Sequence, residues 1–118
     1  MESSPKKFGD YGETLAVNFL KKHGYTIIQR NYKCIYGEID IIAKENNCIV
    51  FIEVKTRKTG GEILPEDSIN YAKERRLTKA AEYYINGLDY YDGDFRFDVV
   101  SIIVNNNKPQ ITIITDAF

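Results

Sequence analysis

The chain has 118 residues, a length that suits one domain and is too short for two. Hydrophobic residues make up 43% of it and charged residues 28%, which excludes an intrinsically disordered chain. The formal net charge of −1 excludes a protein that binds nucleic acid through bulk positive charge, although it leaves room for a local basic surface. We therefore expect a single folded domain over residues 1–118.

No secretory signal is visible after Met1, and no apolar run is long enough to cross a membrane. We expect a cytoplasmic protein in which Cys34 and Cys48 are reduced thiols, with no membrane partner. The only histidine, His23, leaves little scope for a histidine-rich metal site or a Ser-His-Asp triad. Any chemistry must then use carboxylates and lysine, with or without a metal.

The predicted elements begin with a helix over about residues 8–23, where apolar residues recur at helical spacing and Gly24 supplies a stop. Segments rich in β-branched and aromatic residues predict the first three strands, at 25–32, 37–44 and 48–56. Asn46-Asn47, in the turn between the second and third strands, favours a tight hairpin.

The second half of the chain begins with a predicted glycine-containing loop from Arg57 to Leu64. Pro65 then opens a long helix that runs to about Asn86, and strands are predicted at 95–104 and 110–115. The order α-β-β-β-α-β-β predicts an α/β or α+β sandwich, built round one mixed central sheet flanked by helices.

The hairpin register places charged residues together on one face. A two-residue turn at Asn46-Asn47 sets Asp40 opposite Glu53 and Glu38 opposite Lys55. Ile42 and Phe51 should form a further pair on that face. The other face should be apolar core, and it comprises Ile39, Ile41, Ala43, Val50, Ile52 and Val54.

As direct cross-strand neighbours, the carboxylates of Asp40 and Glu53 should repel each other. Such repulsion raises the pKa of one of the two carboxyl groups or recruits a cation. Mg²⁺ (or Mn²⁺) suits Asp40 and Glu53, because it takes one or two carboxylates together with waters and a phosphate. Lys55 beside them can orient an attacking water or neutralise developing charge, which suits phosphodiester hydrolysis. The alternative is a charged surface ladder in which Glu38 pairs with Lys55 and the other acids are solvated.

These residues stand among motifs that are specific when taken together. The motifs are Gly9-Asp-Tyr-Gly12-Glu13, Arg30-Asn31, Gly37-Glu38-Ile39-Asp40, Val50 to Arg57, Lys73 with Arg76-Leu77, and Arg96-Phe97-Asp98. Over about residues 9–100 the chain resembles the PD-(D/E)XK nuclease superfamily. Within it, the chain resembles most nearly the YraN-like family of predicted endonucleases, a family that is similar to archaeal Holliday-junction resolvases. Residues 1–8 and 105–118 carry none of this resemblance.

The resemblance implies a restriction-endonuclease-like fold and assigns roles to individual residues. Asp40 and Glu53 match the metal-binding acids, and Lys55 matches the catalytic lysine. Glu13 matches the acid of the first helix that completes the metal site, although its position alone indicates only a solvated helix residue. Small domains of this kind often act as dimers, so a homodimer is an expectation of the resemblance.

Basic residues near this site are candidates for contacting a nucleic-acid backbone. Arg30 and Lys33 lie in a stretch from Thr14 to Gly37 that holds no acid, and Arg57 lies just past Lys55. Lys73 and Arg76 lie one turn apart on the second helix. For each of these residues, the alternative is an ordinary solvated surface.

Three further residues are expected to support the site. We favour Glu38 as the partner that holds Lys55 over a role as a further metal ligand, because a catalytic lysine needs an orienting neighbour. Arg96 and Asp98 share a strand face, which favours a structural ion pair over a direct role.

The sequence therefore favours a metal-dependent endonuclease that acts on DNA, with branched or structured DNA as the suggested substrate. The rival interpretation is a non-catalytic nucleic-acid-binding protein that keeps the nuclease fold. A weaker third interpretation is an interaction module whose tyrosines meet a protein partner.

Overall fold

The structure is a computed structural model, and residues 5–59 and 71–118 are described in it. The elements in chain order are α1 (Pro5–Lys22), β1 (Thr26–Cys34), β2 (Gly37–Glu45), β3 (Cys48–Lys58), α2 (Tyr71–Asn86), β4 (Asp94–Asn105) and β5 (Lys108–Ile114). This confirms the predicted order. The predicted loop starts too early, because Arg57 and Lys58 still pair with β4 as part of β3. The rest of that loop and the predicted helix start at Pro65 lie outside the described residues.

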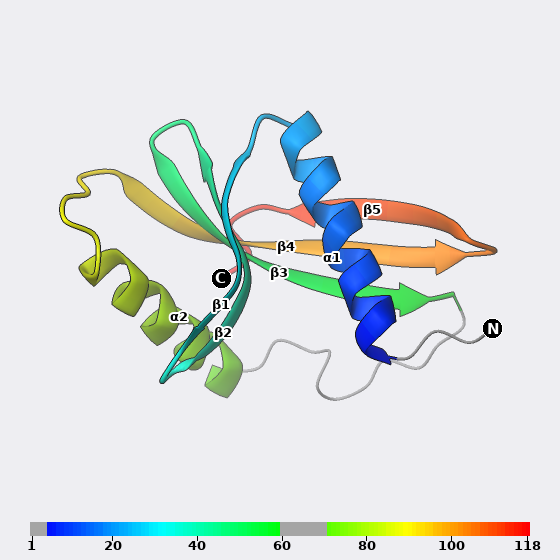
Figure 1. The fold of residues 1–118 in the computed structure, drawn as a ribbon, viewed down its shortest axis with the longest axis horizontal. Helices are drawn as coiled ribbons and strands as arrows, with labels where there is room; N and C mark the ends of the chain where they lie inside the picture. Colours follow the sequence, from blue (N-terminus) through cyan, green and yellow to red (C-terminus); the bar gives the residue numbers. More distant parts are fainter. Residues whose placement is uncertain (1–4, 60–70) are drawn as a thin grey trace.

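The five strands form one mixed sheet in the order β1-β2-β3-β4-β5. β3 and β4 are parallel, so the chain must cross over between them, and α2 lies in that crossover; the other neighbours are antiparallel. α1 covers one face of the sheet and α2 packs beside β1 and β2 on the other (Figure 1). The mixed sheet between two helices is compatible with a restriction-endonuclease-like fold.

The first half of β3 is buried on both faces of the sheet, which explains why this strand begins as an almost unbroken apolar run. Beneath α1 the core comprises Ala16, Val17, Leu20, Tyr25, Ile41, Ala43, Val50, Ile52, Val100 and Ile102. Beneath α2 it comprises Ile39, Ile42, Ile49, Phe51, Ala80, Ala81 and Phe97. The hairpin face on which the acids were predicted is thus apolar core at its Ile42–Phe51 end.

Gly12 lets helix α1 approach β3 closely. A Cβ atom at this position would lie 1.9 Å from Oγ1 of Thr56 and 2.8 Å from its Cβ. Since those distances are far below van der Waals contact, only glycine fits here without a shift of α1 or β3. The next residue on the helix is Glu13, so the same close approach holds this acid against the sheet.

We expect Gly12→Ala to destabilise the protein by about 1–3 kcal/mol, the usual cost of overpacking. Gly9→Ala is the matched control in the same helix, because a Cβ there meets nothing within 4 Å. The control should stabilise slightly, since alanine favours a helix by up to about 1 kcal/mol over glycine. Urea denaturation of the two variants measures the difference, and equal stabilities would contradict this packing.

The sheet forks between β2 and β3. The predicted hairpin register is confirmed where Ile41 pairs with Ile52 and Ile42 with Phe51. The β2–β3 ladder ends at Ile41–Ile52, so the expected Asp40–Glu53 and Glu38–Lys55 pairs do not form part of it. Beyond this point β2 continues to pair with β1 as far as Gly37, while β3 continues beside β4. Figure 1 shows the β1–β2 hairpin running steeply across the other three strands.

The fork also breaks the side-chain alternation of β2. Ile41 and Ala43 lie in the core beneath α1, whereas Ile39 joins Ile42 in the core beneath α2. The prediction that Ile39 shares a face with Ile41 is therefore wrong. Asp40 lies at the point where the alternation changes, directly at the opening of the fork.

Candidate functional site

Asp40 is held in the opening of the fork by the backbone of the facing strand. Its Oδ2 atom accepts a hydrogen bond of 2.8 Å from the N–H of Val54. Burial raises the pKa of Asp40 from its ordinary value of 3.8 to about 6, while the Val54 hydrogen bond acts in the opposite direction. The negative charges of Glu53, Glu13 and Glu38 raise this pKa further. The site therefore carries an excess of negative charge that is only partly solvated.

Glu53 approaches the same region from β3. Its Oε1 atom forms an ion pair with Nζ of Lys73, which comes from helix α2. Its Oε2 atom is buried and has no hydrogen-bond partner among the described residues. A buried carboxylate oxygen without a partner is costly, so this atom is suited to accept a cation or a water proton.

Asp40 and Glu53 line one small pocket of about 30 Å³, which is room for a water molecule or a small ion. The lining residues are Glu38, Ile39, Asp40, Phe51, Ile52, Glu53, Leu77, Phe97, Asp98 and Phe118. Leu77 and Phe118 line the pocket although the sequence did not predict either of them there. The helical spacing of Leu77 from Ala80 and Ala81 is a signal that could have found it, whereas no local signal points to Phe118.

The donor set fits a magnesium or manganese ion held by two carboxylates. The unpartnered Oε2 of Glu53 and the acidic surroundings of Asp40 are what such an ion would satisfy. Within residues 5–59 and 71–118, no three acidic, histidine or cysteine side chains come close enough to hold an ion together. Waters would have to supply the remaining ligands, which is usual for Mg²⁺.

Glu13 is buried and fixed beside the fork by two residues of β1. Its Oε1 accepts hydrogen bonds from Nε of Arg30 at 3.0 Å and from Nδ2 of Asn31 at 3.1 Å. Asn31 has a positive φ of 53° and lies between the pairs that Arg30 and Tyr32 make with β2, at the level of Asp40. Glu13 is thus an ordered acid near the site, and its role as a metal ligand stays a prediction.

Lys55 lies two residues after Glu53 on β3, so side-chain alternation turns it toward the face on which α2 packs. It is half-buried and is not one of the described residues that line the pocket. The support predicted from Glu38, which lines the pocket, stays a prediction. Lys73 is a second cation close to the acids, and the hairpin alone gave no indication of it.

The five basic residues expected to contact a nucleic acid come from three elements, β1, β3 and α2, and their contact with a nucleic acid stays a prediction. Arg30 forms an ion pair with Glu13, and Lys73 forms one with Glu53. Lys33 is exposed on β1, opposite Glu38, while Arg57 is half-buried near the end of β3. Arg76 is exposed on α2.

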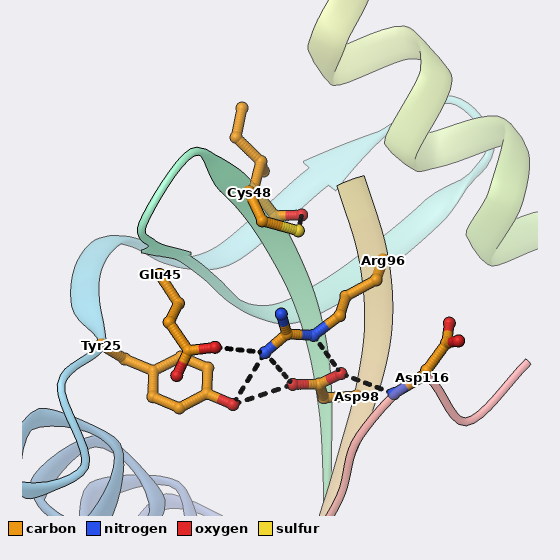
Figure 2. A network of polar contacts seen from close by, with 7 residues as sticks. Tyr25, Glu45, Cys48, Arg96, Asp98 and Asp116 are labelled. Atoms are coloured by element: carbon orange, nitrogen blue, oxygen red, sulfur yellow. Dashed lines mark hydrogen bonds and ion pairs between the residues drawn. The ribbon is translucent and has the colours of Figure 1, made fainter. Parts of the chain in front are cut away.

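The ion pair predicted between Arg96 and Asp98 is confirmed, with Nε and Oδ1 3.0 Å apart. Asp98 is buried, and its carboxylate also accepts hydrogen bonds from the hydroxyl of Tyr25 and the backbone N–H of Asp116. The guanidinium of Arg96 further pairs with Glu45 at 2.9 Å (Figure 2). This network joins the residue before β1 to β2, β4 and the segment after β5, which indicates a structural role.

The raised pKa of Asp40 predicts a pH-dependent stability in the absence of metal. Because the folded state holds this proton more tightly than the unfolded state, stability should fall as pH rises from about 4 to 6. Asp40→Asn removes the titration and should be more stable than wild type above pH 6, by about 2–3 kcal/mol. Below pH 4 the two proteins should be alike.

Urea denaturation at several pH values, with a chelator present, measures this difference. Asp89→Asn changes an exposed aspartate and should follow wild type throughout. A constant gap between wild type and Asp40→Asn from pH 4 to 8 would show that the Asp40 carboxyl titrates normally.

The fold and the site define an α+β domain with paired carboxylates where its mixed sheet forks. The chain belongs to the uncharacterised protein family UPF0102, whose model matches residues 12–102. A UPF0102 protein of Caldicellulosiruptor bescii is 50% identical over 118 residues, covering 96% of this chain and 98% of the relative. One of Clostridium acetobutylicum is 44% identical and one of Geobacter metallireducens 42%, and both alignments cover 96% of this chain and more than nine-tenths of the relative.

Neither described helix is long and apolar enough to span a membrane.

Proposed function

We propose that this protein is a metal-dependent endonuclease that hydrolyses phosphodiester bonds in DNA. The observation that carries the proposal is the pair of carboxylates of Asp40 and Glu53 in one pocket, where Oε2 of Glu53 is buried and has no hydrogen-bond partner in the described part of the chain. The cost of such an arrangement is relieved when a divalent cation binds. The resemblance to YraN-like proteins and the PD-(D/E)XK superfamily agrees with this reading.

Asp40 and Glu53 are the residues that would hold Mg²⁺ or Mn²⁺; Glu13, the third acid that the resemblance implies, would have to move closer to reach the same ion. The ion would supply Lewis-acid activation of the phosphate and a bound water of lowered pKa. The Val54 N–H fixes one oxygen of Asp40 and leaves the other for the ion. Lys55 orients the attacking water or neutralises charge on the phosphate, and Glu38 holds Lys55.

The proposed partner is DNA with a branched or otherwise structured region, and two copies of the chain would address two strands symmetrically. A single domain with one small acidic pocket can place only one phosphate at a time. A homodimer is therefore part of the proposal.

The proposal is tested by incubating the protein with duplex, single-stranded and four-way-junction DNA, each with Mg²⁺, with Mn²⁺ and with a chelator. We expect cleavage that needs a divalent ion and is lost in Asp40→Asn and Glu53→Gln. Asp89→Asn, at an exposed position, should cleave like wild type. Cleavage that survives both pocket substitutions would place the activity elsewhere or in a contaminant.

A melting curve with and without Mn²⁺ gives an independent measure of metal binding. An ion held by these carboxylates should raise the melting temperature of wild type and have little effect on Asp40→Asn. Equal shifts in the two proteins would contradict the proposed site. Tight DNA binding with no cleavage of any form would instead favour a non-catalytic nucleic-acid-binding protein.

A further inference from the structure

Helix α2 presents an exposed row in which tyrosines and cations are combined. Tyr71, Arg75, Lys79 and Tyr83 follow one another at intervals of four residues and form a ridge along the helix, here called the α2 stripe. Tyr71 is 74% exposed and Tyr83 50% exposed, although large aromatic side chains are usually buried. The inner side of α2 packs on β2 (Figure 1). All four residues of the stripe are exposed, so the stripe lies away from that side.

Neighbouring rings and cations of the stripe contact one another. The guanidinium of Arg75 lies 5.7 Å from the centre of the Tyr71 ring. Nζ of Lys79 lies 5.9 Å from the ring centre of Tyr36, which in turn meets Tyr83 edge-on. Such contacts hold the rings and the positive charges in an ordered surface that a ligand can use without reorganising it.

The surface is hollowed on both sides of the stripe. One hollow, of about 180 Å³, is lined by Ala72, Arg75, Arg76 and Lys79, three of them basic, with no acid among its described lining residues. The other, of about 380 Å³, is lined by Tyr71, Glu74, Arg75, Thr78, Lys79, Glu82 and Phe118. A phosphate backbone is therefore accommodated on the Arg76 side and repelled by Glu74 and Glu82 on the other.

The second hollow borders the candidate site. Phe118 lines both this hollow and the pocket of Asp40 and Glu53. Its ring stacks on Phe97, with ring centres 4.7 Å apart. Phe118 is thus the residue that the second hollow and the acidic pocket have in common.

We propose that the α2 stripe binds an unpaired strand of the DNA substrate, with bases stacked on its tyrosines and phosphates on Arg75, Arg76 and Lys79. Exposed aromatic rings beside a basic hollow match single-stranded nucleic acid, since the base faces of a paired duplex are already stacked. The inference rests on the proposed function and narrows its substrate to DNA with a single-stranded region, such as a flap or a splayed junction.

The test measures binding of a labelled oligothymidylate of about 12 nucleotides by fluorescence anisotropy, with a chelator present so that no cleavage occurs. Tyr71→Ala should weaken binding by about 5-fold to 100-fold, as expected for the loss of one stacked base. Arg75→Ala should also weaken binding and lower the slope of log affinity against log salt by about 0.7. A duplex of equal length should bind more weakly than the single strand.

The matched controls lie elsewhere on the surface. Tyr90 is 80% exposed in the segment after α2, and Lys22 is exposed at the end of α1. Tyr90→Ala and Lys22→Ala should bind the single strand like wild type. Equal effects of Tyr71→Ala and Tyr90→Ala, tighter binding of the duplex, or no binding of either DNA would overturn the inference, and the last outcome would favour a protein partner for the stripe.

The two proposals fail in different ways. If the stripe binds single-stranded DNA but the protein cleaves no DNA with any metal, the proposed endonuclease activity is wrong and the proposed role of the stripe stands. Metal-dependent cleavage with unchanged binding in Tyr71→Ala and Arg75→Ala would do the opposite.

Discussion

Lys55→Ala should lower the cleavage rate at saturating DNA by about 100-fold to 1,000-fold and leave DNA affinity almost unchanged. Lys55 follows Glu53 by two residues on the same strand, next to the acids that would hold the ion. Negative charge builds on the phosphate and the attacking water only in the transition state, so a cation placed there acts mainly on turnover. Single-turnover cleavage and a binding isotherm measure the two quantities separately.

Arg76→Ala should show the reverse pattern. This side chain is exposed on α2 beside the basic hollow, away from the acidic pocket. Its loss should weaken DNA binding and flatten the salt dependence while the rate at saturation stays near that of wild type. If Lys55→Ala loses as much affinity as Arg76→Ala, Lys55 is a further phosphate contact and the proposed role is wrong.

Asp98→Ala should destabilise the protein by about 3–5 kcal/mol, enough to unfold a marginally stable domain. The carboxylate of Asp98 is the common partner of the Arg96 guanidinium, the Tyr25 hydroxyl and the Asp116 N–H. Burial and the negative charge of Asp98 raise the pKa of Tyr25 to about 12, so the Tyr25 hydroxyl stays protonated and donates to Asp98. Removing Asp98 leaves these groups without their buried acceptor.

Asp98→Asn keeps the shape and loses only the charge, so it should cost less than Asp98→Ala. Asp94→Ala is the surface control on the same strand and should change the free energy of unfolding by less than about 0.5 kcal/mol. Chemical denaturation compares the three variants. Equal stabilities of Asp98→Ala and Asp94→Ala would mean that the network contributes nothing to the fold.

The acids of the site illustrate how far the hairpin pattern reaches. The turn at Asn46-Asn47 and the period-two pattern correctly predicted the register through Ile42–Phe51 and Ile41–Ile52. They could not predict where the ladder ends, because that depends on β1 and β4 drawing β2 and β3 apart. As a result, the Asp40 carboxylate is held by the Val54 N–H at the fork, and no regular cross-strand pair with Glu53 forms.

The contacts of Glu13 and Lys73 are a second feature that the local sequence pattern could not predict. Local sequence described Glu13 as a solvated helix acid and Lys73 as a helix cation that could contact a nucleic-acid backbone. The packing of α1 and α2 is what brings both residues to the fork. Glu13 reaches it because Gly12 allows α1 to touch Thr56, and Lys73 because α2 packs on the opposite face and pairs with Glu53. Contacts between distant elements cannot be read from local periodicity, which reports only the element to which a residue belongs.

The sequence by itself determined the element order, the hairpin register near its turn and the Arg96–Asp98 pair, because each depends on neighbours within one or two strands. The tertiary structure decided the fork of the sheet, the unpartnered oxygen of Glu53 and the position of Phe118 beside the acidic pocket. These features depend on how the described strands and helices share one interior. Packing of both helices against a mixed sheet fixes them, and no single segment carries that information.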